Sequence, residues 1–282
     1  MKWQGRRESR NIEDRRGRSK TRAAGGIGGV GLVAVLVVGY FLGIDVTPLL
    51  QSRGGGQMVA SSEMTAEDKS AGQFVSVTLA DTEEVWAQVF KDQLGRHYTP
   101  ATLVLFKGVT QSPCGGASGA SGPFYCPGDN KAYLDTDFFV TLERQLGAKG
   151  DFAAAYVVAH EIAHHVQGEL GILSRANEVR AQVSLAESNA ISVRMELQAD
   201  CFAGIWARGA QEKFGSIDRG DLEEAINAAR QIGDDTLQRN AGKRPNPHSF
   251  MHGTSEQRSR WFVTGYQSGE LRSCDTFSTN NL

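Results

Sequence analysis

The sequence predicts an α+β fold in which helices dominate over a small sheet, preceded by one transmembrane helix. Three observations predict this class. Apolar residues recur at helical spacing through most of the chain after residue 138. Two short β-rich runs, 101–107 and 132–135, precede that region. Residues 23–44 form an uninterrupted stretch without a charged side chain.

Charge is divided unevenly along the 282 residues. The formal net charge is −2, from 30 basic and 32 acidic side chains. Residues 1–22 hold nine basic and three acidic side chains, a charge of +6, which leaves −8 for the rest of the chain. A net charge so near zero is unlike that of a nucleic-acid-binding protein, so no nucleic-acid partner is expected.

Residues 23–44 have the length of a membrane-spanning helix, since about 20 apolar residues cross the hydrocarbon core of a bilayer. No small-residue cleavage site follows, which favours a retained anchor over a cleaved signal peptide or a buried helix. The basic excess before this stretch indicates a cytoplasmic N-terminus in the cell membrane and a periplasmic or extracellular body. We therefore expect a basic cytoplasmic tail at 1–22, a single-pass anchor at 23–44, a flexible linker at 45–72 and a folded domain at 73–282.

The elements of the folded domain follow from periodicity and turn residues. Strands are predicted at 101–107 and 132–135, separated by a Gly- and Ser-rich loop at 111–130. Helices are predicted at 74–90 with a bend near Ala80, and at 138–146, 152–169, 177–208 and 221–232, with another after the capping-box pattern of Thr254 and Gln257.

The pattern His160-Glu161-Ile-Ala-His164 lies on the predicted helix 152–169. Positions i and i+4 share one face of a helix, so the two imidazoles can bind one metal ion. Glu161 is turned away from that face, which lets its carboxylate reach water at the metal without displacing it. His165 is expected to be a packing or surface residue. Catalytic zinc takes three protein ligands, so a third must come from elsewhere in the chain.

Glu196 is the expected third ligand. A third histidine at position 170 is missing, because that residue is Leu170 and Gln167 stands where such an extended pattern has glycine. Among the downstream glutamates on the following helix, Glu196 is followed four residues later by another carboxylate, Asp200. This spacing supplies both a ligand and an acceptor for the second ring nitrogen of a ligand histidine. The alternative, a solvated helical patch with a surface charge pair, conflicts with the apolar character of the helix around His160.

These motifs together resemble a known family. They are HEIAHHVQ (160–167), MELQADCFAGIW (195–206), CGGASGASGPFYCPGDNKAYLD (114–135) and KWQGRRESRNIEDRRG (2–17). They are similar to the bacterial putative neutral zinc metallopeptidase family of membrane-anchored proteins, over nearly the whole chain. The resemblance implies a zincin-like metallopeptidase domain with Zn²⁺ as cofactor and a peptide or protein as substrate.

More distantly, the pair HExxH and ExxAD resembles the gluzincin clan. In membrane-linked relatives of that clan, a histidine followed six residues later by arginine lies near the active site. His252 and Arg258 have this spacing, with Gly253 where those relatives commonly carry proline. The resemblance implies that His252 donates a hydrogen bond in the transition state and that Arg258 lies behind the ligands near Asp200. The alternative for His252 is a residue that merely neighbours a helix cap.

The expected activity is therefore zinc-dependent peptide hydrolysis with Glu161 as general base and His160, His164 and Glu196 as ligands. The strand near Leu103–Phe106 is a candidate edge for pairing with an extended peptide. The competing hypothesis is a non-catalytic zinc-binding envelope protein that acts in binding or quality control. A base beside a complete ligand set argues against it, since a structural zinc site has no use for a base.

The four cysteines are expected to form two disulfides in an oxidising exported compartment. Cys114 and Cys126 bracket a Gly- and Ser-rich loop, and closing a loop of that size is worth ~3 kcal/mol in the chain-entropy model. A bond between Cys201 and Cys274 would join the end of the chain to the helix that carries Glu196. A buried free thiol at Cys201 is the alternative.

Overall fold

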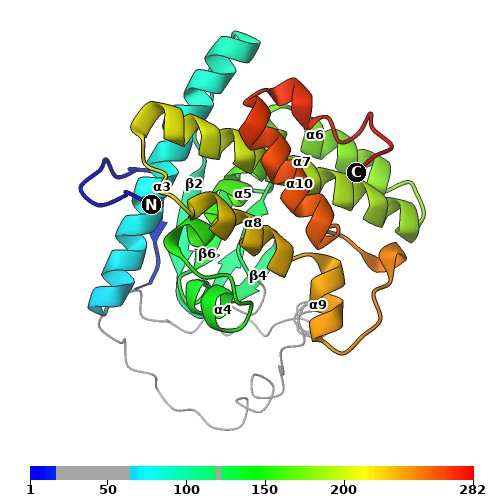
Figure 1. Cartoon of the computed structure of the whole chain (residues 1–282), viewed down its shortest axis with the longest axis horizontal. Coiled ribbons are helices and arrows are strands. Elements are labelled where there is room, and N and C mark those ends of the chain that lie inside the picture. The colour runs from blue at the N-terminus through cyan, green and yellow to red at the C-terminus, as the bar shows by residue number, and fades with distance from the viewer. Residues whose placement is uncertain (17–63, 119–121) are drawn as a thin grey trace.

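Among the residues that the structure describes, helices form most of the domain and the strands form two small sheets (Figure 1). The computed structural model describes residues 1–16, 64–118 and 122–282. In chain order the elements begin with β1 (Ile12–Asp14), α3 (Ala66–Val89) with a π turn at Phe90–Leu94, β2 (Thr102–Phe106), β3 (Val109–Ser112), β4 (Gly115–Ser118), β5 (Phe124–Cys126) and β6 (Lys131–Asp135). The helices that follow are α4 (Phe138–Arg144), α5 (Asp151–Glu169), α6 (Ile172–Arg180), α7 (Leu185–Phe214), α8 (Asp221–Gln231), α9 (Asp234–Asn240) and α10 (Ser255–Ser268). Two 3₁₀ turns lie before and after α10, at Pro247–Ser249 and Leu271–Cys274. The helix-dominated α+β class is confirmed.

The larger sheet has the strand order β1-β2-β6-β5, in which β1, β2 and β6 are parallel and β5 is antiparallel to β6. Leu103 of β2 pairs with Ile12 on one side and with Ala132 on the other. The expectation that the strand near Leu103–Phe106 offers a free edge is therefore wrong, because β1 already occupies that edge. The expected loop at 111–130 contains β5 and the hairpin of β3 and β4.

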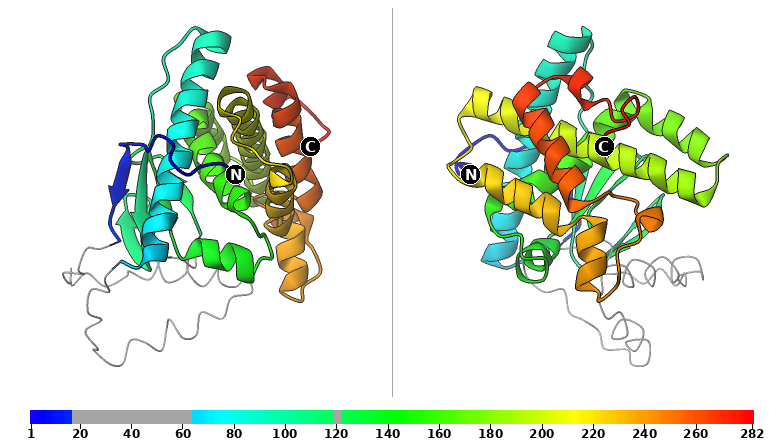
Figure 2. Two further views of the ribbon diagram at one scale, coloured as in Figure 1. Left: turned by 60° about the vertical axis from the view of Figure 1, so that its left-hand side comes forward. Right: turned by 45° about the vertical axis from the view of Figure 1, so that its right-hand side comes forward.

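Helix α5 lies in the middle of the domain, between the sheet with α3 on one side and α7, α8 and α10 on the other (Figure 2). Its apolar and alanine-rich sequence suits this position, since nearly the whole helix is buried. Phe152 stacks on Trp206 of α7 with ring centroids 5.7 Å apart, and Tyr156 meets Phe262 of α10 edge-on. Burial on all sides fixes the helix that carries the His160–His164 motif.

Two helix boundaries differ from the expected ones because capping boxes set them. The expected helix 177–208 is divided into α6 and α7, since the Ser184 hydroxyl accepts a hydrogen bond from the Glu187 backbone N–H and the Glu187 carboxylate accepts one from Ser184. In the same way Thr65 and Asp68 start α3 at Ala66, eight residues before the expected position. No bend occurs at Ala80, which lies inside the continuous α3.

Residues 1–16 pack on the surface of α3 and the sheet. Trp3 meets the ring of Phe74 edge-on at 5.6 Å, and the Arg6 guanidinium makes two hydrogen bonds of 2.7 Å to the Asp81 carboxylate. The chain then enters β1 and adds the outer strand to the sheet.

The segment 1–16 thus packs on the folded body. Its positive charges pair with acidic side chains of α3, including Glu83 and Glu84. The expected bounds, a basic tail at 1–22 and a domain that starts at 73, stay predictions. The expected division into a cytoplasmic tail and an exported body stays a prediction.

The expected transmembrane helix at 23–44 lies outside the described residues, as does the expected linker up to residue 63. Within the described ranges, no helix combines the length and apolar character needed to cross a membrane.

Replacing Arg6 with alanine is expected to lower the free energy of unfolding by about 3 kcal/mol, because loss of one partner leaves the other charge buried and unpaired. The Asp81 side chain is only 4% exposed and that of Arg6 20%. Burial raises the pKa of Asp81 to about 6 against the opposing charge of Arg6. Urea denaturation measures the change, and the exposed Arg10→Ala is the control, with an expected effect below about 0.5 kcal/mol. Equal losses for the two variants would show that the ion pair does not hold the segment.

Candidate metal centre

Helices α5 and α7 bring the three predicted metal ligands together. His160 and His164 lie one turn apart on α5, with ring centroids 4.8 Å apart. Glu196 reaches them from α7, with its two carboxylate oxygens 3.1 Å from His160 Nε2 and 3.5 Å from His164 Nε2. The potential ligand atoms of all three residues lie within 4.8 Å of one another.

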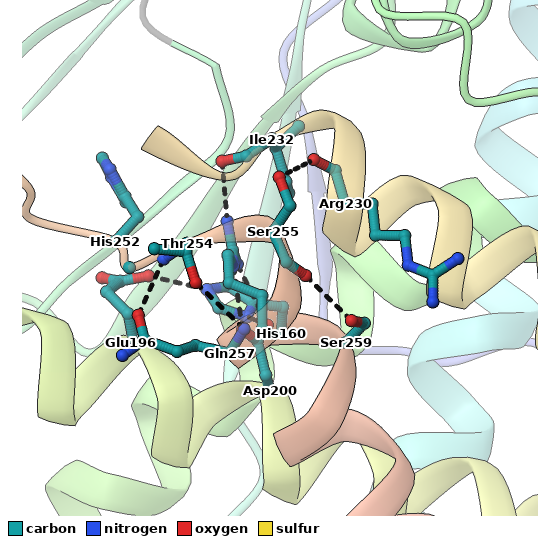
Figure 3. Close-up of polar contacts among 12 residues, drawn as sticks. His160, Glu196, Asp200, Arg230, Ile232, His252, Thr254, Ser255, Gln257 and Ser259 are labelled. Atoms are coloured by element: carbon teal, nitrogen blue, oxygen red, sulfur yellow. Dashed lines mark hydrogen bonds and ion pairs between the residues drawn. The ribbon is translucent and has the colours of Figure 1, made fainter. Parts of the chain in front are cut away.

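The second ring nitrogen of each histidine has its own acceptor. His160 Nδ1 lies 2.9 Å from Asp200 Oδ1, and His164 Nδ1 lies 2.9 Å from Gln167 Oε1 (Figure 3 shows the contacts of His160). Both Nε2 atoms are then available toward Glu196. Two imidazoles oriented through Nδ1 and one carboxylate are the donor set of a catalytic zinc site, so the residues present fit that ion. Gln167 was not predicted, and its spacing of three from His164 on one helix was the available signal.

Asp200 connects the metal ligands to α10. Arg258 donates from Nε to Asp200 Oδ2 at 2.8 Å and from Nη2 to Oδ1 at 3.0 Å, and the Tyr156 hydroxyl donates to Oδ1 as well. Asp200 has no exposed surface and Arg258 is 2% exposed. Although burial opposes ionisation, the charges of Arg258 and His160 hold the pKa of Asp200 below its usual range. The structure thus places Asp200 and Arg258 together directly behind His160.

The protonation of the site reflects its negative charge. Burial disfavours an imidazolium, but the carboxylates of Asp200 and Glu196 raise the pKa of His160 to about 10. Burial also lowers the pKa of His164, but the charge of Glu196 outweighs it and raises that pKa. Burial disfavours an ionised Glu196, but the two histidines hold the pKa of Glu196 well below its usual value. These pKa shifts favour protons on the imidazoles opposite ionised carboxylates.

Glu161 lies beside the ligands but outside the hydrogen-bond network. The residue is 9% exposed, and burial raises the pKa of its carboxyl above 4.5. Within the described part of the chain no donor is hydrogen-bonded to its carboxylate. The group therefore remains available for a proton from a bound water molecule.

His252, in the segment before α10, lies near enough to Glu196 for their charges to interact, and it is held by Asp234, the first residue of α9. Asp234 Oδ1 lies 3.0 Å from His252 Nδ1, and Asp234 Oδ2 accepts the backbone N–H groups of Met251, His252 and Gly253. With 45% of its side chain exposed, His252 is open to solvent, whereas His160 is 8% exposed. No local pattern indicated Asp234, which lies 18 residues upstream and contacts His252 only in the fold.

His165 is a packing residue, one of the two roles expected for it. Its Nε2 donates to the Thr99 carbonyl at 2.7 Å, and its ring contacts those of Tyr98 and Tyr125 edge-on. It joins α5 to the segment before β2 and takes no part in the ligand set.

Both expected disulfides are present. Cys114 is bonded to Cys126, which closes the loop before β5. Cys201 is bonded to Cys274, which ties the C-terminal 3₁₀ turn to α7 next to Asp200, so the alternative of a free thiol at Cys201 is wrong.

The site combines two histidines of the HExxH pattern on α5 with Glu196 from α7 and the carboxylate of Glu161 beside them. This arrangement is that of a metallopeptidase-type centre. The chain belongs to the family described as Putative neutral zinc metallopeptidase, whose family model matches residues 1–277. It is 46% identical to the uncharacterized protein YpfJ of Escherichia coli K12, over 98% of this chain and 99% of that protein. It is 43% identical to the uncharacterized protein Rv2575 of Mycobacterium tuberculosis, over 75% of this chain and 74% of that protein. No solved structure matches it.

Zinc affinity is expected to rise with pH between about pH 6 and 8, because the metal must displace protons from the histidines. The pKa of His160 is raised to about 10 and that of His164 is raised as well, so these imidazoles favour the protonated form and zinc must release their protons when it binds. Competition with a chelator measures the affinity, and calorimetry in buffers of different ionisation enthalpy measures the protons released. Release of more than one proton per zinc ion is expected at pH 6. A pH-independent affinity would contradict the charge balance described above.

Proposed function

We propose that this chain is a zinc-dependent endopeptidase that hydrolyses peptide bonds in protein substrates. One observation carries the proposal: the buried carboxylate of Glu161 lies beside the converging set of His160, His164 and Glu196, and it accepts no hydrogen bond from the residues that the structure describes. Membership of a family described as zinc metallopeptidases supports the same reaction.

When bound, a zinc ion supplies Lewis-acid activation of water and of the scissile carbonyl. The two histidines and Glu196 would hold it. Glu161 accepts a proton from the attacking water and passes it to the nitrogen of the leaving amine. Burial helps because a raised pKa makes the Glu161 carboxylate a better proton acceptor than an exposed glutamate.

His252 is suited to donate a hydrogen bond to the oxygen that becomes negative in the transition state. Asp234 accepts from Nδ1 and leaves Nε2–H for the substrate. Burial lowers the basicity of the imidazole, but the hydrogen bond to Asp234 and the charge of Glu196 together raise the pKa of His252. A half-exposed imidazole held by a fixed carboxylate is a preorganised donor.

A non-catalytic zinc-binding protein is the alternative hypothesis. A structural zinc site is normally closed by four protein ligands. Among the described residues this site has three candidate ligands, with a base beside them. The arrangement therefore favours catalysis.

Glu161→Gln is expected to abolish peptide cleavage, with a loss of at least about 10³-fold in kcat, while one zinc ion stays bound. The amide keeps the shape of the side chain but cannot accept the proton. Cleavage of fluorescein-labelled unfolded casein and metal analysis of the same samples provide the two readouts. Full activity in this variant would rule out Glu161 as the base, and absence of zinc from the wild-type protein would end the proposal.

The matched control is Glu169→Gln, the same substitution near the end of α5, and it should leave cleavage unchanged. In the same assay His252→Ala should retain zinc and reduce kcat by about 10²- to 10³-fold, the cost of removing one donor to the developing charge. A wild-type rate in His252→Ala would show that the imidazole merely neighbours the helix cap at Thr254 and does not contact the substrate.

A further inference from the structure

Gln167 is a fully buried polar side chain on α5, one turn after His164. Its amide makes three hydrogen bonds. Nε2 donates to the Met195 carbonyl at 2.8 Å and to Gln198 Oε1 at 3.0 Å, and Oε1 accepts from His164 Nδ1 at 2.9 Å. Both N–H groups of the amide are thus used on α7, on either side of Glu196.

The hydrogen-bond partners fix which way this amide points. A backbone carbonyl can only accept, so the atom facing Met195 must be the NH₂ group of Gln167. Gln198 is oriented in the same manner, because its own Nε2 donates to the Cys274 carbonyl at 3.0 Å and leaves its Oε1 for Gln167. The disulfide from Cys274 to Cys201 holds that carbonyl against α7. A flipped amide at Gln167 would place two acceptors against each other.

We propose that Gln167 is a positioning residue that fixes the tautomer and ring orientation of His164 for metal binding. The inference deepens the zinc-peptidase function proposed above and rests on it. Because Gln167 Oε1 can only accept, the proton of a neutral His164 must reside on Nδ1. The lone pair is then on Nε2, the nitrogen that faces Glu196.

The two ligand histidines are therefore held by different chemistry. His160 faces a carboxylate, Asp200, whose charge is matched by Arg258. His164 faces a neutral amide. A carboxylate at that position would add a further negative charge to a buried site that already contains Glu161 and Glu196, and no second arginine is paired there among the described residues.

Three full-length variants test this role through zinc affinity, measured by chelator competition, and through thermal unfolding. Gln167→Met removes the acceptor and is expected to weaken zinc binding by about 10- to 100-fold. Gln167→Glu keeps an acceptor for His164 Nδ1 but loses both donors to α7. It should bind zinc at least about tenfold more tightly than Gln167→Met while its unfolding temperature falls.

The control is Gln238→Met, which removes another buried amide that makes two hydrogen bonds, to Ser249 and Asn246, and contacts none of the ligands. It should lower the unfolding temperature and leave zinc affinity within about twofold of wild type. Zinc affinity in Gln167→Met that matches this control would overturn the inference. If Gln167→Met does not fold, Gln167→Glu decides: binding more than about 100-fold weaker than wild type overturns the role, and binding within about tenfold supports it.

The inference and the proposed function fail differently. Normal zinc binding in Gln167→Met, together with an active wild-type enzyme, would remove only the positioning role. A wild-type protein that binds no zinc would remove both.

Discussion

The carboxylate of Asp200 is the contact on which the rest of the site depends. It accepts hydrogen bonds from His160 on α5 and from Arg258 on α10, and it belongs to α7 itself. Three helices are therefore joined at one buried anion. Removing either Asp200 or Arg258 would leave the other's charge unpaired in a region of low dielectric, a loss that typically amounts to ~3–5 kcal/mol. The same contact fixes His160 for metal binding, so stability and function share this carboxylate.

Charge balance explains why the site suits a divalent cation. Glu161, Glu196 and Asp200 bring three carboxyl groups into a buried region in which Arg258 is the one guanidinium described. Burial keeps the proton affinity of Glu161 high, whereas the histidines hold Glu196 ionised. A zinc ion in place of the protons would neutralise the excess negative charge and leave Glu161 as the group free to exchange a proton.

The parts of the site that the sequence predicted are those with a local period. The spacing of four between His160 and His164, and between Glu196 and Asp200, places each pair on one helical face whatever the rest of the fold does. Asp234 could not be found in this way, because its contact with His252 depends on how α9 packs before α10. The position of Gln167, three residues after His164, is visible in the sequence, but its role depends on hydrogen-bond acceptors from α7, which only the fold brings near.

The same distinction explains the fold. Helix-dominated architecture, β2, β6 and the α10 cap follow from local patterns, whereas β1 does not. The basic residues at the start of the chain predict a membrane-topology signal, which stays a prediction. Arg6 also pairs with Asp81, far away in sequence. That pairing is a tertiary interaction that net charge cannot reveal. The most direct test of the account is X-ray absorption at the zinc edge of the zinc-loaded protein. The proposed site predicts one zinc ion per chain, with two imidazole nitrogens and a carboxylate oxygen each ~2.0–2.2 Å from the zinc ion. A sulfur ligand, or a shell of oxygen atoms alone, would contradict the proposed ligand set. An oxygen-only shell is what zinc bound to Asp151, Asp221 and Glu224 would produce.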